Sequence, residues 1–91
     1  MSDDPALEQL REQVSDLDRS ILAAVNERLH LVAEIKAHKE ANGLGFLDPG
    51  REEAMLAELL RANAGPLSDR GVGELLSAVL DLTKREVARG D

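Results

Sequence analysis

The 91-residue sequence contains no cysteine, tryptophan or tyrosine, and its single aromatic side chain is Phe46. The lack of cysteine excludes a disulfide, a thiolate zinc site and a thiol nucleophile. With so few aromatic side chains, the core must consist of leucine, valine, isoleucine and alanine, which favours helices packed against helices. The absence of cysteine also fits the cytoplasm, which is the location we expect.

Long hydrophobic runs are also missing. No apolar stretch approaches the roughly 20 residues that a membrane-spanning helix requires, and the N-terminus lacks a signal-peptide pattern. The chain carries 18 acidic and 11 basic residues, which gives a formal net charge of −7. A surface of this sign argues against nucleic acid and anionic membranes as partners. We therefore predict one small domain, residues 1–91, that binds neither.

One long helical pattern, from about residue 6 to about residue 41, contains no glycine or proline. At 1.5 Å per residue such a helix is about 54 Å long, whereas a compact monomer of this size has a radius of gyration of about 12 Å. Its heptad positions form an apolar seam from Leu7 to Ile35, interrupted by Arg28. Because the helix is longer than the globule that one chain can form, we predict a homodimer in which a second copy covers the seam.

The next segment predicts a turn followed by a shorter helix. Gly43 and Gly45 are typical of a helix C-terminus and a turn. Asp48 is the expected N-cap of a helix over about residues 49–63, with Pro49 at its first position.

Ser68 or Asp69 is the expected N-cap of a third helix, over about residues 69–88. The predicted fold is therefore all-α, with three helices of which one is very long. The apolar stripes that we expect to be buried consist of Met55, Leu56, Leu59 and Leu60 in the second helix, and of Val72, Leu75, Leu76, Val79, Leu82 and Thr83 in the third.

Arg28 and Lys39 lie on one face of the long helix, about 16 Å apart along its axis. A cation on an apolar seam is costly to desolvate, so Arg28 is expected either to pair with another group of the protein or to have a functional role. With Val32 and Ile35 between the two cations, this face suits a small, partly apolar dicarboxylate. The alternative is that Arg28 extends its guanidinium to water or pairs with a carboxylate on a neighbouring helix.

Other charged residues are less informative by themselves. Arg11 flanks the seam, and its spacing fits a solvated charge that pairs with Glu8 or Ser15. Asp48, Arg51 and Glu52 lie one turn apart near a helix start, where capping and a surface ion pair are the usual explanation.

The sequence shows no phosphate-binding loop and no Ser–His–Asp set. His30 and His38 lack the acidic neighbours of a metal site. If the protein is an enzyme, its chemistry needs no nucleophile, metal or other cofactor.

Over essentially its full length, the chain resembles the all-helical, AroQ-type chorismate mutases. The resemblance rests on Leu10-Arg11 followed by Leu17-Asp18, on NERLHLVAEIKAHK (26–39), on FLDPGREEAML (46–56) and on a third helix of matching length. The loop and the NAGP turn (63–66) are most similar to the form fused to some 3-deoxy-heptulosonate-7-phosphate (DAHP) synthases. The resemblance implies an intertwined dimer with two equivalent sites, which rearranges chorismate to prephenate.

By the same resemblance, Arg28 and Arg51 bind the substrate carboxylates, and Arg11 arrives from the partner chain for the same purpose. Lys39 donates to the ether oxygen, and Glu52, with Asp48 near it, meets the ring hydroxyl. The implied catalytic residues are therefore Lys39, Arg28 and Glu52. The implied substrate-binding residues are Arg11, Arg28, Lys39, Asp48, Arg51, Glu52, Thr83 and Val87.

These roles agree with the chemistry, because a unimolecular rearrangement needs orientation and a cation at the breaking C–O bond. Thr83 keeps the hydroxyl of the serine usual in the family, but Val87 stands where the family has glutamine or glutamate, a second donor to the ether oxygen. Losing one such donor costs about 2.7–4 kcal/mol in the barrier. Glu86 is expected to point about 100° away from Val87.

The departure at Val87 leaves three possibilities: low activity, a shift of the third helix that brings Glu86 into use, or a regulatory role. The alternative functions are a chorismate- or prephenate-binding regulatory module of a DAHP synthase, an isochorismate pyruvate-lyase and a plain helical dimerisation module.

Overall fold

The structure, a computed structural model, describes residues 4–45 and 50–89. It contains three helices in chain order: α1 (Pro5–Ala41), α2 (Arg51–Ala62) and α3 (Asp69–Arg89). No strand is present in these two ranges. The predicted all-α fold with one very long helix is confirmed. Within the same ranges, none of the three helices combines the length and the hydropathy that a membrane span requires.

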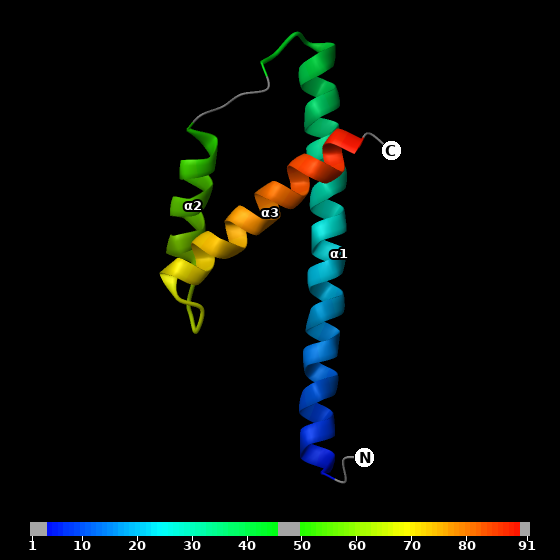
Figure 1. The fold of residues 1–91 in the computed structure, drawn as a ribbon, viewed down its shortest axis with the longest axis vertical. Coiled ribbons are helices and arrows are strands. Elements are labelled where there is room, and N and C mark those ends of the chain that lie inside the picture. Colours follow the sequence, from blue (N-terminus) through cyan, green and yellow to red (C-terminus); the bar gives the residue numbers. More distant parts are fainter. Residues whose placement is uncertain (1–3, 46–49, 90–91) are drawn as a thin grey trace.

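Helix α3 is the central element of the fold. It runs obliquely between the other two helices and packs against both, whereas α1 and α2 do not pack on each other in the part of the chain that the structure describes (Figure 1). Among residues 4–45 and 50–89, those buried in the single chain are Val72, Leu76 and Thr83, and all three belong to α3. The relative position of α1 and α2 is therefore set through α3.

Local hydrogen bonds define both ends of α1. The Asp4 carboxylate accepts from the backbone N–H groups of Ala6 and Leu7 at 3.0 and 3.3 Å, which makes Asp4 the N-cap of this helix. At the other end, Gly43 has a positive φ of 65°. The Leu44 N–H donates to the Lys39 carbonyl at 2.8 Å. This six-to-one bond with a left-handed glycine is a Schellman motif, and it ends the helix directly after the turn that carries Lys39.

The starts of α2 and α3 differ from each other. Gly50 occupies the N-cap of α2, where no side chain caps the helix, and the predicted cap Asp48 lies outside the described residues. In α3, the Ser68 hydroxyl accepts from the Gly71 N–H at 3.0 Å. Of the two predicted caps for α3, Ser68 is therefore the one that the structure uses.

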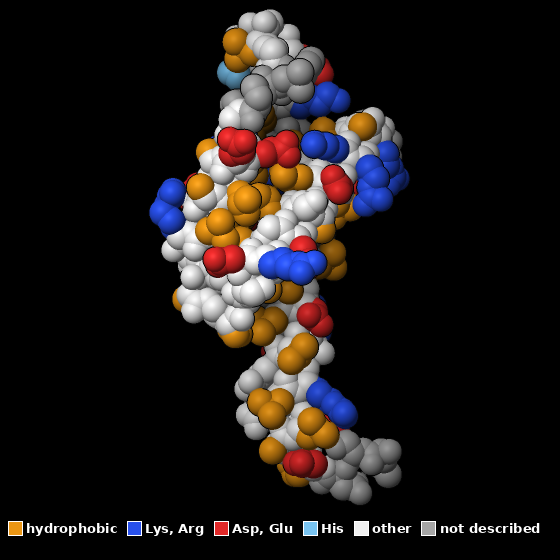
Figure 2. Space-filling view, turned by 60° about the vertical axis from the view of Figure 1, so that its left-hand side comes forward, with side chains coloured by type: hydrophobic (Ala, Val, Ile, Leu, Met, Phe, Trp, Pro, Cys, Tyr) orange, Lys and Arg blue, Asp and Glu red, His pale blue; other side chains and the backbone are white. Residues whose placement is uncertain are grey.

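The N-terminal half of α1 extends beyond the other helices, and its apolar seam is uncovered (Figure 2). Leu10, Leu17 and Ile21 are 58%, 64% and 61% exposed. The radius of gyration is 17.4 Å, well above the roughly 12 Å expected of a compact monomer. The prediction that the long helix exceeds what one chain can cover agrees with this geometry.

Two residues of the predicted stripes are exposed in the single chain. Leu59 of α2 and Leu75 of α3 are 41% and 56% exposed, so the expectation that they lie in the core was wrong for one chain. In the part of the chain that the structure describes, α2 packs on α3 alone and α3 packs on two helices only, so neither is covered on all sides.

Candidate functional site

Arg28 is half-buried between α1 and α3, where a hydroxyl group holds it. Its Nη1 donates to Thr83 Oγ1 at 2.7 Å. The Thr83 hydroxyl in turn donates to the Val79 carbonyl at 2.6 Å, one turn earlier in α3. Because its own proton is committed to that carbonyl, the hydroxyl presents an acceptor lone pair to the guanidinium.

The positive charge of Arg28 is not neutralised by this contact. Among the described residues, no carboxylate forms an ion pair with Arg28. The alternative of a carboxylate partner on a neighbouring helix is therefore not what the described residues show. A guanidinium has five N–H donors, and a bond to one neutral hydroxyl leaves most of them for an anion.

A second polar contact links α3 to α2. Lys84 Nζ lies 3.8 Å from Glu52 Oε2, and the two side chains are 67% and 54% exposed. Thr83 and Lys84 are adjacent in α3, so consecutive residues reach Arg28 on one neighbouring helix and Glu52 on the other. Two predicted catalytic residues, Arg28 of α1 and Glu52 of α2, are thus contacted by neighbouring residues of α3. Their own helices do not pack on each other in the described residues.

Sequence reasoning did not single out Lys84. An exposed lysine on a polar helix face carries no periodic signal, and its partner depends on how α3 crosses α2. The adjacent Thr83 was the available hint, because two neighbours on a helix point about 100° apart and can serve two different helices.

Lys39 and Arg51 lie at helix ends. Lys39 is half-buried in the last turn of α1, on the same helical face as Arg28. A cation is favoured there by the partial negative charge of a helix C-terminus. Arg51 is the first residue of α2, is exposed and directly precedes Glu52. Asp48, the remaining charged residue predicted in this loop, lies outside the described residues.

Arg11 lies far from these residues in the single chain. It precedes Arg28 by 17 positions, which corresponds to about 25 Å along a straight helix. It is exposed and pairs with Glu8 at 3.6 Å, as the simpler prediction for it stated. Within one protomer, Arg11 and Arg28 cannot contact one small ligand, so the predicted role of Arg11 depends on a second chain.

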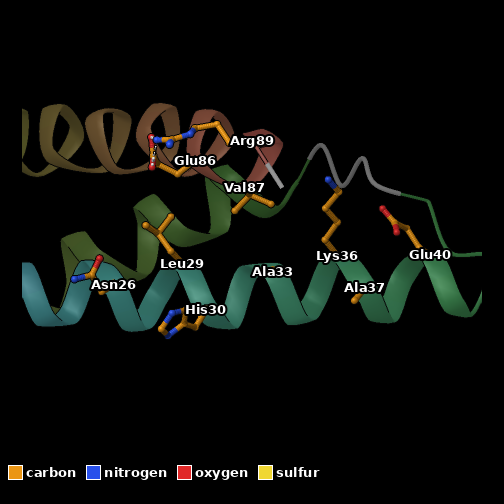
Figure 3. A pocket seen from close by; sticks show the side chains of 10 residues that line it. All are labelled: Asn26, Leu29, His30, Ala33, Lys36, Ala37, Glu40, Glu86, Val87 and Arg89. Atoms are coloured by element: carbon orange, nitrogen blue, oxygen red, sulfur yellow. Dashed lines mark hydrogen bonds and ion pairs between the residues drawn. The ribbon is translucent and has the colours of Figure 1, made fainter. Parts of the chain in front are cut away.

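An open cleft of about 570 Å³ lies between α1 and α3, near the C-terminal end of α3. In Figure 3, Leu29 and Val87 lie between the two helices, and Glu86 pairs with Arg89 at 3.1 Å beside them. Glu86 and Val87 both line the cleft, so the expected angle between them does not exclude Glu86 from it. The lining residues are Asn26, Leu29, His30, Ala33, Lys36, Ala37, Glu40, Glu86, Val87 and Arg89.

Val87 therefore contributes only methyl groups to this space, with no hydrogen-bond donor. Of the predicted site residues, it alone is among those that line this cleft in the described part of the chain. The contact between Arg28 and Thr83 lies on another side of α1, since Arg28 and Leu29 are about 100° apart on the helix.

The sequence and the fold of the chain are both similar to those of known proteins. Residues 10–87 match the family described as chorismate mutase type II. The fold superimposes on form II of the chorismate mutase from Thermus thermophilus with a TM-score of 0.85 and 35% identity, covering 94% of this chain and 98% of that chain. For form I of the same enzyme the TM-score is 0.80 with 36% identity, over 86% of this chain and 98% of that chain.

Two curated sequences are also similar. The T-protein of Haemophilus influenzae is 36% identical over 82 residues, which are 89% of this chain and 21% of that protein. The T-protein of Enterobacter agglomerans is 41% identical over 51 residues, which are 56% of this chain and 14% of that protein. The chain thus spans about a fifth or less of the length of these relatives.

The contact between Arg28 and Thr83 can be tested through stability. We expect Thr83→Val, which keeps the shape but removes the hydroxyl, to lower the free energy of unfolding by about 1–2 kcal/mol, because a half-buried charged donor loses its acceptor. The matched control is Ser77→Ala, an exposed hydroxyl on the same helix, which should change it by less than about 0.5 kcal/mol. Urea unfolding at one fixed protein concentration measures both, and equal values for the two variants would contradict the assignment.

Proposed function

Because this chain belongs to the chorismate mutase type II family, we propose that it is an isomerase that rearranges chorismate to prephenate. The observation that carries the proposal is the state of Arg28, a half-buried cation held by a neutral hydroxyl and without a carboxylate partner among the described residues. Such a group is arranged to receive an anion. The similarity to the Thermus enzyme, over nearly all of that chain, supports the same conclusion.

The first task of the site is to hold the substrate in a folded pose. Arg28 and Arg51 bind its two carboxylates, from α1 and from the start of α2 respectively. A guanidinium fits a carboxylate with two parallel hydrogen bonds, which fixes its direction as well as its position. Because the reaction is unimolecular, this orientation lowers the barrier without any covalent step.

The second task is to stabilise the charge that grows as the C–O bond breaks. Lys39 donates to the ether oxygen, and its place in the last turn of α1 is fixed by the Schellman motif. Glu52 accepts from the ring hydroxyl, and its carboxylate lies at the α3 level that holds Arg28. A role for Asp48 beside Glu52 stays a prediction, as does the location in the cytoplasm.

Arg28 provides the direct test of this activity. We expect Arg28→Ala to lower kcat/KM by at least about 100-fold, because it removes a preorganised charged donor. The matched control is Arg70→Ala, which removes an exposed arginine whose recorded partner, Glu74, is on its own helix at 3.2 Å. The loss of chorismate absorbance reports turnover, and circular dichroism verifies the helical content. A wild-type rate equal to the uncatalysed rate, or equal losses in both variants, would refute the proposal.

We further propose that the working form is a homodimer. The apolar seam of α1 is more than half exposed at Leu10, Leu17 and Ile21, and pairing with a second α1 would cover it. The same pairing would bring Arg11 of one protomer to the site that contains Arg28 of the other. Arg11 could then bind the same ligand as Arg28 of the other protomer. Within one chain, the distance between Arg11 and Arg28 does not allow this.

A subunit-mixing experiment tests the contribution of Arg11. Arg11→Ala and Arg28→Ala are each expected to be nearly inactive as pure proteins. In a re-equilibrated equal mixture, half of the dimers combine one chain of each type, and one of their two sites contains both arginines. About a quarter of the wild-type activity should therefore return. An absence of recovery, with mixed dimers verified by mass spectrometry, would show that Arg11 does not act across the interface.

A second candidate function is favoured by Val87. Because this residue offers only methyl groups, the chain could bind chorismate or prephenate while turning it over slowly, as a regulatory module of a DAHP synthase. The predicted resemblance to the DAHP synthase-fused form supports this candidate. Ligand binding without turnover, together with a change in the activity of that synthase on mixing, would favour it. Salicylate formed from isochorismate would instead favour the lyase.

Replacing Val87 separates an impaired enzyme from a non-catalytic module. If the missing donor limits the rate, Val87→Gln should raise kcat by about tenfold or more, because one such donor is worth about 100-fold when perfectly placed. Val87→Leu is the control, since it changes the size of the side chain without supplying a donor. No gain in the glutamine variant, or an equal gain in both, would show that position 87 does not limit catalysis.

A further inference from the structure

We propose that Lys84 is a positioning residue for catalysis, which holds the Glu52 carboxylate of α2 at the level of α3 where Thr83 holds Arg28. The inference rests on the proposed function, because it takes Glu52 to act on the substrate. It starts from the ion pair between α2 and α3, with 3.8 Å between Lys84 Nζ and Glu52 Oε2.

This ion pair differs from the other surface ion pairs of the described residues because it joins two helices. In the described residues, α1 and α2 do not pack on each other, so the distance between Arg28 and Glu52 is set through α3. Thr83 fixes one of these residues and its neighbour Lys84 contacts the other. The other ion pairs recorded in the described residues join positions three or four apart within one helix.

The start of α2 needs such support. Its N-cap, Gly50, provides no side-chain hydrogen bond, and Arg51 and Glu52 are both exposed. A carboxylate side chain that is more than half exposed can adopt several rotamers, and ordering it costs conformational entropy. A cation on the adjacent helix restricts that freedom, and a carboxylate held in place is more effective than a mobile one.

The expected effect is modest because both side chains are more than half exposed. We expect Lys84→Met to lower kcat/KM by about two- to fivefold, mainly in kcat, and Lys84→Arg to restore most of the loss. Arg85→Met is the matched control, because it removes an equal charge from the next, also exposed, position of α3. About 1 M salt should reduce the difference between wild type and Lys84→Met, since salt screens exposed ion pairs.

A double-mutant cycle distinguishes positioning from direct contact with the substrate. If Lys84 acts through Glu52, Lys84→Met should change kcat/KM by less than about 1.5-fold in a Glu52→Gln background. If Lys84 contacts the substrate carboxylates itself, the two losses should multiply. Multiplying losses, or a loss no greater than that of Arg85→Met, would overturn the proposal.

A readout that does not require turnover keeps this inference separate from the proposed function. In protein labelled with ¹³C-glutamate, the Glu52 carboxyl signal, assigned by its loss in Glu52→Gln, should move in Lys84→Met and stay in Arg85→Met. If the wild type is inactive but this signal moves, the proposed function fails while the contact between Lys84 and Glu52 stands. If the signal does not move, Lys84 does not hold Glu52.

Discussion

The hydrogen bond between Arg28 and Thr83 is the interaction on which the rest of this structure depends. It places a guanidinium between two helices without neutralising it, because the acceptor is a hydroxyl rather than a carboxylate. Withdrawing a charge from water is costly unless hydrogen bonds compensate, and here a buried hydroxyl compensates only in part. A doubly charged anion would complete the compensation. The same contact therefore joins α1 to α3 and leaves the guanidinium without a carboxylate partner among the described residues.

Helix α3 connects the stability of the chain to its chemistry. It contains the buried residues Val72 and Leu76, and it also carries Thr83 and Lys84, which reach the other two helices. Apart from Val72, Leu76 and Thr83, no described residue is buried in the single chain, and a long apolar seam on α1 is exposed. A second protomer would supply both the missing burial and the missing Arg11. In the proposed dimer, folding, assembly and substrate binding would therefore use the same surfaces.

Much of this arrangement could be predicted from the sequence, since it follows from local rules. The period of the apolar residues located the long helix and placed Arg28 on its inner face, and Gly43 marked its C-terminal end. What could not be predicted depends on how the helices cross. The pairing of Lys84 with Glu52 and the exposure of Leu59 and Leu75 follow from α3 lying between two helices that do not meet. Periodicity identifies an inward face but not the neighbour that covers it.

The way in which α1 ends places an unusual constraint on the chain. No atom of the described residues lies within 4 Å of where a Cβ atom on Gly43 would be, so a larger side chain would meet no obstacle among them. Its backbone, however, adopts a left-handed conformation at φ 65°, which costs other residues on the order of 1 kcal/mol. A substitution here would loosen the turn whose carbonyl is bonded to Leu44, and with it the base of the Lys39 side chain. The position of the Lys39 ammonium group is in this way tied to the backbone conformation of a glycine four residues further along the chain.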